Sequence, residues 1–330
     1  YLLTNRCAYL ATCDGKDPFK PIEGSIPFMV YYASRYRGLC VGSLVSRMVV
    51  LTASVCVVNP LSLVRDTRAV TVVVGSPYRH PRRGIRVPVT KILLPKLAES
   101  VGTRAYLIEK SVAVFLLKRK VPDVLTDVAL RGISLDWRGE ETLILHQECF
   151  IPGWHYFYKG DKIFPVIKFH LHRNLRVQFL RIVKMTEWCE TLSVKLQKAL
   201  ENMGFRGYYE EDGIVCVRDP NGNSQPCHGM YGTPLICKAR QVGIMLAPDA
   251  QWTNCTGFSN VIHLLSAKFL RAFMTCVSRL FDPEVPVDWK GMQSSLINEH
   301  ETYDYIPSMY DKLLGGSSSM EDEELHFAGY

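Results

Sequence analysis

The sequence predicts an all-β protein built from antiparallel sandwiches or barrels. From Ile26 to Val277, short β-branched and aromatic runs such as "AVTVVVG" and "SVAVFLL" alternate with Gly, Pro and Asp. Many short strands at near-regular spacing are typical of this class. The chain has 330 residues, 47% of them hydrophobic, which is enough to bury a large core in one big domain or two packed halves.

Two segments depart from the strand pattern and predict helices. Residues 185–203 carry helix formers with apolar spacing, and residues 262–280 form a second candidate that would close the fold. The apolar stripe expected on this second helix contains Leu265, Phe269, Phe273, Cys276 and Leu280. Residues 284–330 include "GGSSS" and "EDEE" with little periodicity, which predicts an extended or disordered tail.

The cysteines indicate an oxidising compartment. There are eleven, and none forms paired CxxC motifs, so they fit zinc poorly and a disulfide-bonded, secreted, extracellular domain well. No apolar run approaches the roughly 20 residues that span a bilayer, so no membrane span is expected. Nucleic acid is not an expected partner for such a domain.

Charge is distributed unevenly along the chain. The net charge is +7, but the segment from Asp282 onward has eleven Asp/Glu and two Lys, so it carries −9 and the preceding part +7 + 9 = +16. The two parts should attract each other, or each should attract a different partner. The segment "YRHPRRGIR" contains four arginines: Arg79, Arg82, Arg83 and Arg86. It is either a solvated basic loop or an anion-binding loop for an acidic segment or a sulfated glycan.

Several motifs in order resemble the chymotrypsin-like (trypsin-family) serine proteases. "PFMVYYASRYRGLCVGSLVSRMVVLTASVC" resembles the start of the protease domain, and "CFIPGW", "DGIVCV", "CHGMYGTPLIC" and "CTGFSNVIHLL" resemble its later motifs. The resemblance covers about residues 22–281. It implies two antiparallel six-stranded β-barrels, at about 22–140 and 141–261, and a helix at about 262–281. We therefore predict a domain of residues 22–283 between an N-terminal segment, 1–21, and an acidic extension, 284–330.

The resemblance also implies four disulfides: Cys40–Cys56, Cys149–Cys237, Cys189–Cys216 and Cys227–Cys255. Three cysteines remain. Cys7 and Cys13 could close a small local loop, or one of them could be tethered to Cys276. One of the three should be unpaired or intermolecular, which allows an oligomer linked through it or through the acidic tail.

The catalytic residues that the family requires are replaced. The histidine position is Val55, the aspartate position is Ser111, or Ala113 on a shifted alignment, and the serine position is Tyr231. A Ser-His-Asp relay needs a nucleophile, a base and a carboxylate that orients the base. None of these residues supplies its group, so the resemblance implies a pseudoprotease rather than an enzyme.

Supporting elements of the family are replaced as well. Met230 stands where an aspartate would pair with a new N-terminus, and Pro248 follows Leu246 and Ala247 on the substrate-binding strand. The base of the specificity pocket falls at Gln225 or a close neighbour. Proline removes an N–H from an edge that would pair with a peptide. Gly229, the oxyanion-hole position, is retained.

The remaining motifs predict no cofactor and no metal. His170 and His172 share a strand face, but no third ligand is evident. Asn254 begins the one N-glycosylation sequon, "NCT". Tyrosines among acids, in "YDYIPSMYDK", suit either sulfation or packing on a protein surface.

These observations favour a secreted, non-catalytic protease homologue that binds proteins, such as a cofactor or regulator of an extracellular protease cascade or an adhesion or reproductive-fluid protein. One alternative is a structural component of an extracellular assembly. Another is a protease with a rearranged relay, using for example His228 beside the turn.

Overall fold

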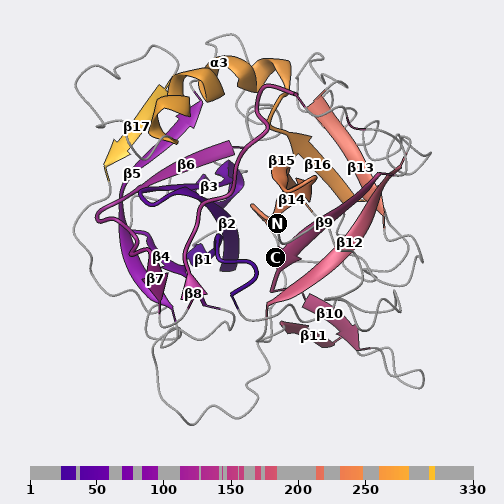
Figure 1. Cartoon of the computed structure of the whole chain (residues 1–330), viewed down its shortest axis with the longest axis horizontal. Helices are drawn as coiled ribbons and strands as arrows, with labels where there is room; N and C mark the ends of the chain where they lie inside the picture. The colour runs from indigo at the N-terminus through magenta and orange to yellow at the C-terminus, as the bar shows by residue number, and fades with distance from the viewer. Residues whose placement is uncertain are drawn as a thin grey trace.

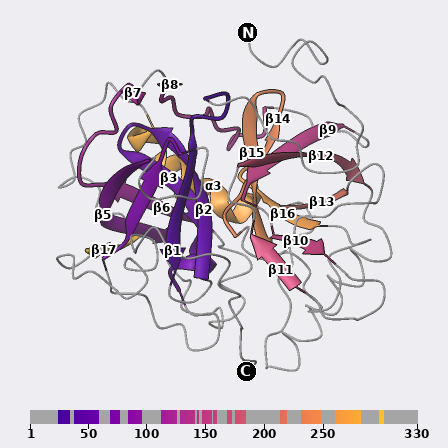
Figure 2. The same cartoon turned by 90° about the horizontal axis from the view of Figure 1, so that it is seen from below.

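The structure is a computed structural model of the whole chain. It describes residues 24–34, 38–58, 69–76, 84–95, 112–125, 128–140, 143, 147–154, 156–159, 168–171, 175–183, 213–218, 231–247, 260–281 and 297–301. Two antiparallel six-stranded barrels lie side by side (Figures 1 and 2). The predicted fold class is confirmed.

The first barrel closes through the strand order β1-β2-β3-β6-β5-β4, with β4 returning to β1. Its centre is filled by the β-branched and aromatic runs of the sequence, and β6 is buried at all six of its residues. The strands are β1 Met29–Ser34, β2 Gly38–Ser46, β3 Val49–Ala53, β4 Thr71–Val74, β5 Ile85–Pro95 and β6 Val112–Leu117.

The second barrel closes through the order β12-β13-β16-β15-β14-β9. Along β12, buried and exposed residues largely alternate, as expected when one strand face meets the core and the other meets solvent. The strands are β9 Glu148–Gly153, β12 Arg176–Val183, β13 Ile214–Arg218, β14 Pro234–Cys237, β15 Arg240–Ala247 and β16 Asn260–Leu264. Two short pairs lie outside the barrels: β7 Val124–Leu125 with β8 Val128–Ala129, and β10 Tyr156–Lys159 with β11 Lys168–Leu171.

Helix α3, Lys268–Val277, continues into the 3-10 turn η3, Ser278–Leu280. The prediction of a helix from residue 262 was wrong at its start, because Asn260–Leu264 is strand β16, paired with β13 and β15. The buried helix face packs on the first barrel's core through Leu270, Phe273, Met274 and Val277, whereas Cys276 is half-buried. The helix expected at 185–203 lies outside the described residues.

Part of the acidic extension is ordered as a strand. Residues Ile297–Glu301 form β17, which pairs antiparallel with Lys91–Pro95 of β5 outside the barrel (Figure 1). The prediction of an extended or disordered segment did not include this pairing. Among the described helices, none has the length and apolarity required to cross a membrane.

The barrels are joined by an apolar cluster and by buried hydrogen bonds. Trp154 packs edge-on against Tyr31, with ring centroids 4.9 Å apart, in a cluster with Leu39, Val41 and Leu175. The Ser43 hydroxyl of β2 donates to Oε1 of Gln241 on β15 at 2.5 Å. These contacts fix the positions of β2 and β15, on which the turn between the barrels rests.

Candidate functional site

The turn that contains Tyr231 is held between the two barrels by its main chain. The N–H of Val41, on β2 of the first barrel, donates to the carbonyl oxygen of Tyr231 at 3.0 Å. The N–H of Gly232 donates to the carbonyl oxygen of Met245, on β15 of the second barrel, also at 3.0 Å. The N–H of Met245 returns a bond to the carbonyl oxygen of Thr233 at 2.9 Å. The turn thus links β2 to β15.

Gly232 is the residue at which this turn approaches the first barrel most closely. Its φ is +87°, in the left-handed region that favours glycine. A Cβ atom here would lie 2.1 Å from the carbonyl oxygen of Val41 and 2.6 Å from Oγ1 of Thr52. Both the backbone conformation and the close approach therefore require glycine.

The strands beneath the turn are bonded through side chains. The Thr52 hydroxyl donates to the carbonyl oxygen of Val41 at 2.7 Å, and because a hydroxyl has one hydrogen, the Tyr32 hydroxyl donates to Thr52 at 2.7 Å. Burial raises the pKa of Tyr32 far above its usual value, so this phenol stays protonated. Val41 therefore has its N–H bonded to the turn and its carbonyl bonded to Thr52.

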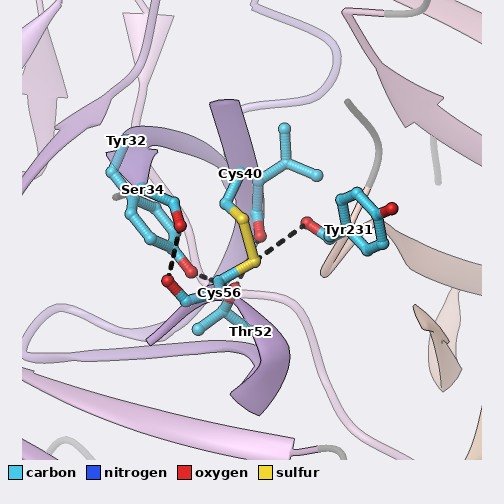
Figure 3. The surroundings of a disulfide bond; sticks show 7 residues. Tyr32, Ser34, Cys40, Thr52, Cys56 and Tyr231 are labelled. Atoms are coloured by element: carbon cyan, nitrogen blue, oxygen red, sulfur yellow. Dashed lines mark hydrogen bonds between the residues drawn. A yellow bond between two sulfur atoms is a disulfide. The ribbon is translucent and has the colours of Figure 1, made fainter. Parts of the chain in front are cut away.

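The Cys40–Cys56 disulfide lies next to Tyr231, as Figure 3 shows. The bridge has a Cα–Cα distance of 6.2 Å, and Sγ of Cys56 lies 3.9 Å from the carbonyl oxygen of Tyr231. The Ser34 hydroxyl donates to the carbonyl oxygen of Cys56 at 2.6 Å. The turn thus packs against a loop that is fixed by one covalent and one hydrogen bond.

Val55, at the predicted histidine position, lies in the 3-10 turn η1, Ser54–Cys56. It is 8% exposed and belongs to the first barrel's core, against which the half-buried Tyr231 also packs. The preceding Ser54 buries its hydroxyl with no hydrogen-bond partner among the described residues. Instead of a base facing solvent, this position holds an aliphatic side chain that completes the core.

The two candidates for the aspartate position differ in placement. Ala113 lies within β6, fully buried, and is paired in register with Thr52. Ser111 is outside the described residues, immediately before β6 begins at Val112. Neither residue type carries a carboxylate.

Two of the four expected disulfides are present as predicted: Cys40–Cys56 and Cys149–Cys237. Cys216 is also disulfide-bonded, but its expected partner Cys189 lies outside the described residues, as do both members of the Cys227–Cys255 pair. Cys276 has a free thiol. A tether from Cys276 to the N-terminal cysteines is therefore wrong, and the prediction of a Cys7–Cys13 loop remains untested.

Several other predicted residues lie outside the described part of the chain. They include the turn residues Gly229 and Met230, the pocket position Gln225, Pro248, His172, His228, the sequon Asn254, and the loop residues Arg79, Arg82 and Arg83. Leu246 and Ala247 end β15, and His170 lies in β11 opposite Phe157. The predicted roles of these residues therefore remain predictions.

Arg86, the described member of the predicted basic loop, lies near basic residues that sequence reasoning missed. It is half-buried at the start of β5, and Nη2 of Arg119 donates to its carbonyl oxygen at 3.0 Å. Arg119 is exposed between Lys118 and Lys120, directly after β6. We call Arg86, Lys118, Arg119 and Lys120 the basic cluster; none of the four has an ion-pair partner within the described residues. In the sequence, the run "KRK" was the feature that could have pointed to this cluster.

Comparisons with known proteins agree with this architecture. The trypsin family model matches residues 17–264. Among solved structures, mouse neuropsin, a serine protease expressed in the limbic system of the brain, aligns with a TM-score of 0.54 and 18% identity over 81% of this chain and 99% of its own. The scabies mite inactivated protease paralogue S-D1 aligns with a TM-score of 0.54 and 15% identity over 79% and 96%. No curated protein sequence matches significantly.

The family model spans well over half of the chain, and the two closed barrels, the helix and the two disulfides are arranged as the resemblance implied. The chain therefore belongs to the trypsin family.

Proposed function

We propose that this chain is a non-catalytic member of the trypsin family that acts outside the cell by binding proteins. The observation that carries the proposal is the chemistry of the triad positions. Val55 has no titratable group, Ser111 and Ala113 have no carboxylate, and Tyr231 has a phenol in place of the serine hydroxyl. Because triad members act as a unit, losing all three removes most of the rate enhancement.

The packing of the degenerate site supports a structural role for its residues. Val55 and Tyr231 both pack on the first barrel's core, and the Tyr231 carbonyl accepts a main-chain hydrogen bond from β2. A base and a nucleophile must instead face each other across a solvent-accessible cleft. Among the structural neighbours, one is described as an inactivated protease paralogue, so loss of activity has a precedent on this fold.

A hydrolysis assay tests the absence of catalysis. The purified, disulfide-intact chain is incubated with a positional-scanning library of fluorogenic peptides, beside an active trypsin-family protease. We expect no cleavage above the buffer blank. Cleavage that persists through further purification, and that a His228→Ala substitution abolishes, would instead establish the rearranged relay.

The basic cluster supports binding as the remaining activity. Three of its members are consecutive exposed residues, and Arg119 contacts the main chain of Arg86 from the neighbouring strand end. Cations without ionic partners attract acidic ligands and accelerate their encounter. We propose that an acidic polypeptide segment docks on the basic cluster.

A matched pair of charge-neutralised variants tests this docking site. One variant carries Arg86→Gln and Arg119→Gln; the other carries Arg181→Gln and Arg218→Gln, which face each other in register on β12 and β13 of the second barrel. The probe is a fluorescent peptide of residues 320–327, "MEDEELHF". We expect the first variant to bind about tenfold more weakly, or about 1.4 kcal/mol, and the second to bind like the native chain.

Equal losses in the two variants would show that only net charge matters, and the docking proposal would fail. A heparin oligosaccharide forms a second arm of the assay. If it binds through the basic cluster while the peptide does not, the ligand class is a sulfated glycan and the acidic-peptide proposal is wrong.

A further inference from the structure

The outer edge of β5 carries a strand that the barrel does not need. β5 pairs with β6 along one side through Val89–Leu93, and with β4 along the other side through Ile85–Pro88. On the β4 side, the N–H of Val89 also donates to the carbonyl oxygen of Val70, at 2.8 Å. Farther along this edge, the strand that pairs with β5 within the described residues is β17, from Lys91 to Pro95.

β17 is attached to the domain through β5. It holds the terminal position of its sheet and pairs with no other strand in the described part of the chain. The barrel already closes through the β5–β6 and β1–β4 pairings. Residues 281–296 separate β17 from the end of η3, so β17 can leave β5 without breaking the barrel's own ladders.

The register gives the site a charge preference. β17 runs antiparallel to β5, with Ile297 opposite Pro95 and Glu301 opposite Lys91. Opposite charges at directly facing positions stabilise a strand pair, and like charges destabilise it. An added strand obtains affinity from main-chain hydrogen bonds and selectivity from such side-chain positions.

We propose that the outer edge of β5 at Lys91–Pro95 is a binding site for an extended acidic peptide, and that Ile297–Glu301 is its built-in, displaceable ligand. In the resting chain the tethered segment fills the site. When the segment is displaced, the site accepts a strand in trans that presents a carboxylate opposite Lys91. This site is separate from the basic cluster, and neither proposal depends on the other.

The test uses the full, disulfide-intact chain with β17 weakened. The substitutions Asn298→Pro and Glu299→Pro affect adjacent residues, whose N–H groups point to opposite sides, so one of them removes a donor to β5. The matched control carries Ser318→Pro and Ser319→Pro farther along the same acidic extension. Binding of a fluorescein-labelled peptide of residues 295–303 is measured by anisotropy.

We expect the β17 variant to bind the peptide at least about tenfold more tightly than the native chain or the control, because a tethered ligand competes at about millimolar effective concentration. In the full chain, the milder Glu301→Lys substitution should increase binding to an intermediate level, and it leaves every backbone donor in place. Equal binding by all of these chains would overturn the proposal.

A charge exchange tests the register. Lys91→Glu, added to the β17 variant, should weaken binding of the native peptide about tenfold, and a peptide carrying Glu301→Lys should restore it. If the exchanged peptide binds the Lys91→Glu chain no better than the native peptide does, the site does not use this register and the assignment of its ligand is wrong.

Discussion

Replacing Gly232 with alanine tests whether the turn between the barrels is required for the fold. An L-residue at φ +87° costs about 1–2 kcal/mol from backbone strain alone. The added Cβ would lie 2.1 Å from the carbonyl oxygen of Val41, so the turn must move away from β2. That movement lengthens the 3.0 Å bond from Val41 N–H to Tyr231, at a cost of about 1 kcal/mol. We expect a total loss of about 2–3 kcal/mol in the free energy of unfolding.

Gly139 provides the matched control. Its φ is +73°, but among the described residues the atoms that a Cβ there would meet belong to the Ser266 side chain, at 3.2 Å, so Gly139→Ala carries the conformational strain without an overlap with described main chain. We expect the free energy of unfolding of that variant to fall by about 1–2 kcal/mol. The free energies of unfolding of both variants are measured by equilibrium urea unfolding with the disulfides intact, monitored by tryptophan fluorescence. If the two losses agree within about 0.5 kcal/mol, the close approach of the turn to Val41 contributes nothing and the reasoning is refuted.

Three further predictions concern buried polar groups. Gln241→Leu should lower the free energy of unfolding by about 2 kcal/mol, because it leaves the Ser43 hydroxyl buried without its acceptor. Adding Ser43→Ala should recover part of this loss, and an unchanged loss in the double variant would exclude the coupling between the two residues. Ser54→Ala should raise the free energy of unfolding by about 1 kcal/mol, because it removes an unpartnered buried hydroxyl, and a decrease would contradict this. Burial lowers the pKa of His263 to about 3, so the unfolded chain binds a proton that the folded chain does not between pH 6.5 and about 3. Stability should therefore fall as the pH is lowered through this window, by at most about 1.4 kcal/mol per pH unit from this group, and His263→Asn should flatten the profile between pH 6.5 and 5.

The fold was predictable because its signals are local and ordered along the chain. Cys40 and Cys56 flank "VGSLVSRMVVLTASV", and the glycines and proline of "CHGMYGTPLIC" mark a tight turn before a buried strand. Steric requirements of this kind do not depend on catalysis, since Gly232 is needed for the approach to Val41 whatever residue precedes it. The same motifs carry the prediction that the triad positions are replaced.

The features that sequence reasoning missed depend on tertiary neighbours. "NVIHLLSAKFL" is apolar enough for either a strand or a helix, and pairing with β13 and β15 decides that Asn260–Leu264 is a strand. Arg86 and Arg119 are 33 residues apart and meet only because β5 pairs with β6. β17 has five residues and no clear periodicity, and it is identified as a strand by its pairing with β5 rather than by its local sequence.

The central claim, that the turn between the barrels has no acyl-transfer chemistry, is tested most directly by covalent labelling. The native chain is incubated at pH 8 with a fluorophosphonate, which phosphonylates an activated serine of the trypsin family, and its intact mass is measured beside an active protease. We expect the mass of the native chain to be unchanged while the protease gains one adduct. A stoichiometric adduct on the folded chain, lost on denaturation before labelling, would contradict it.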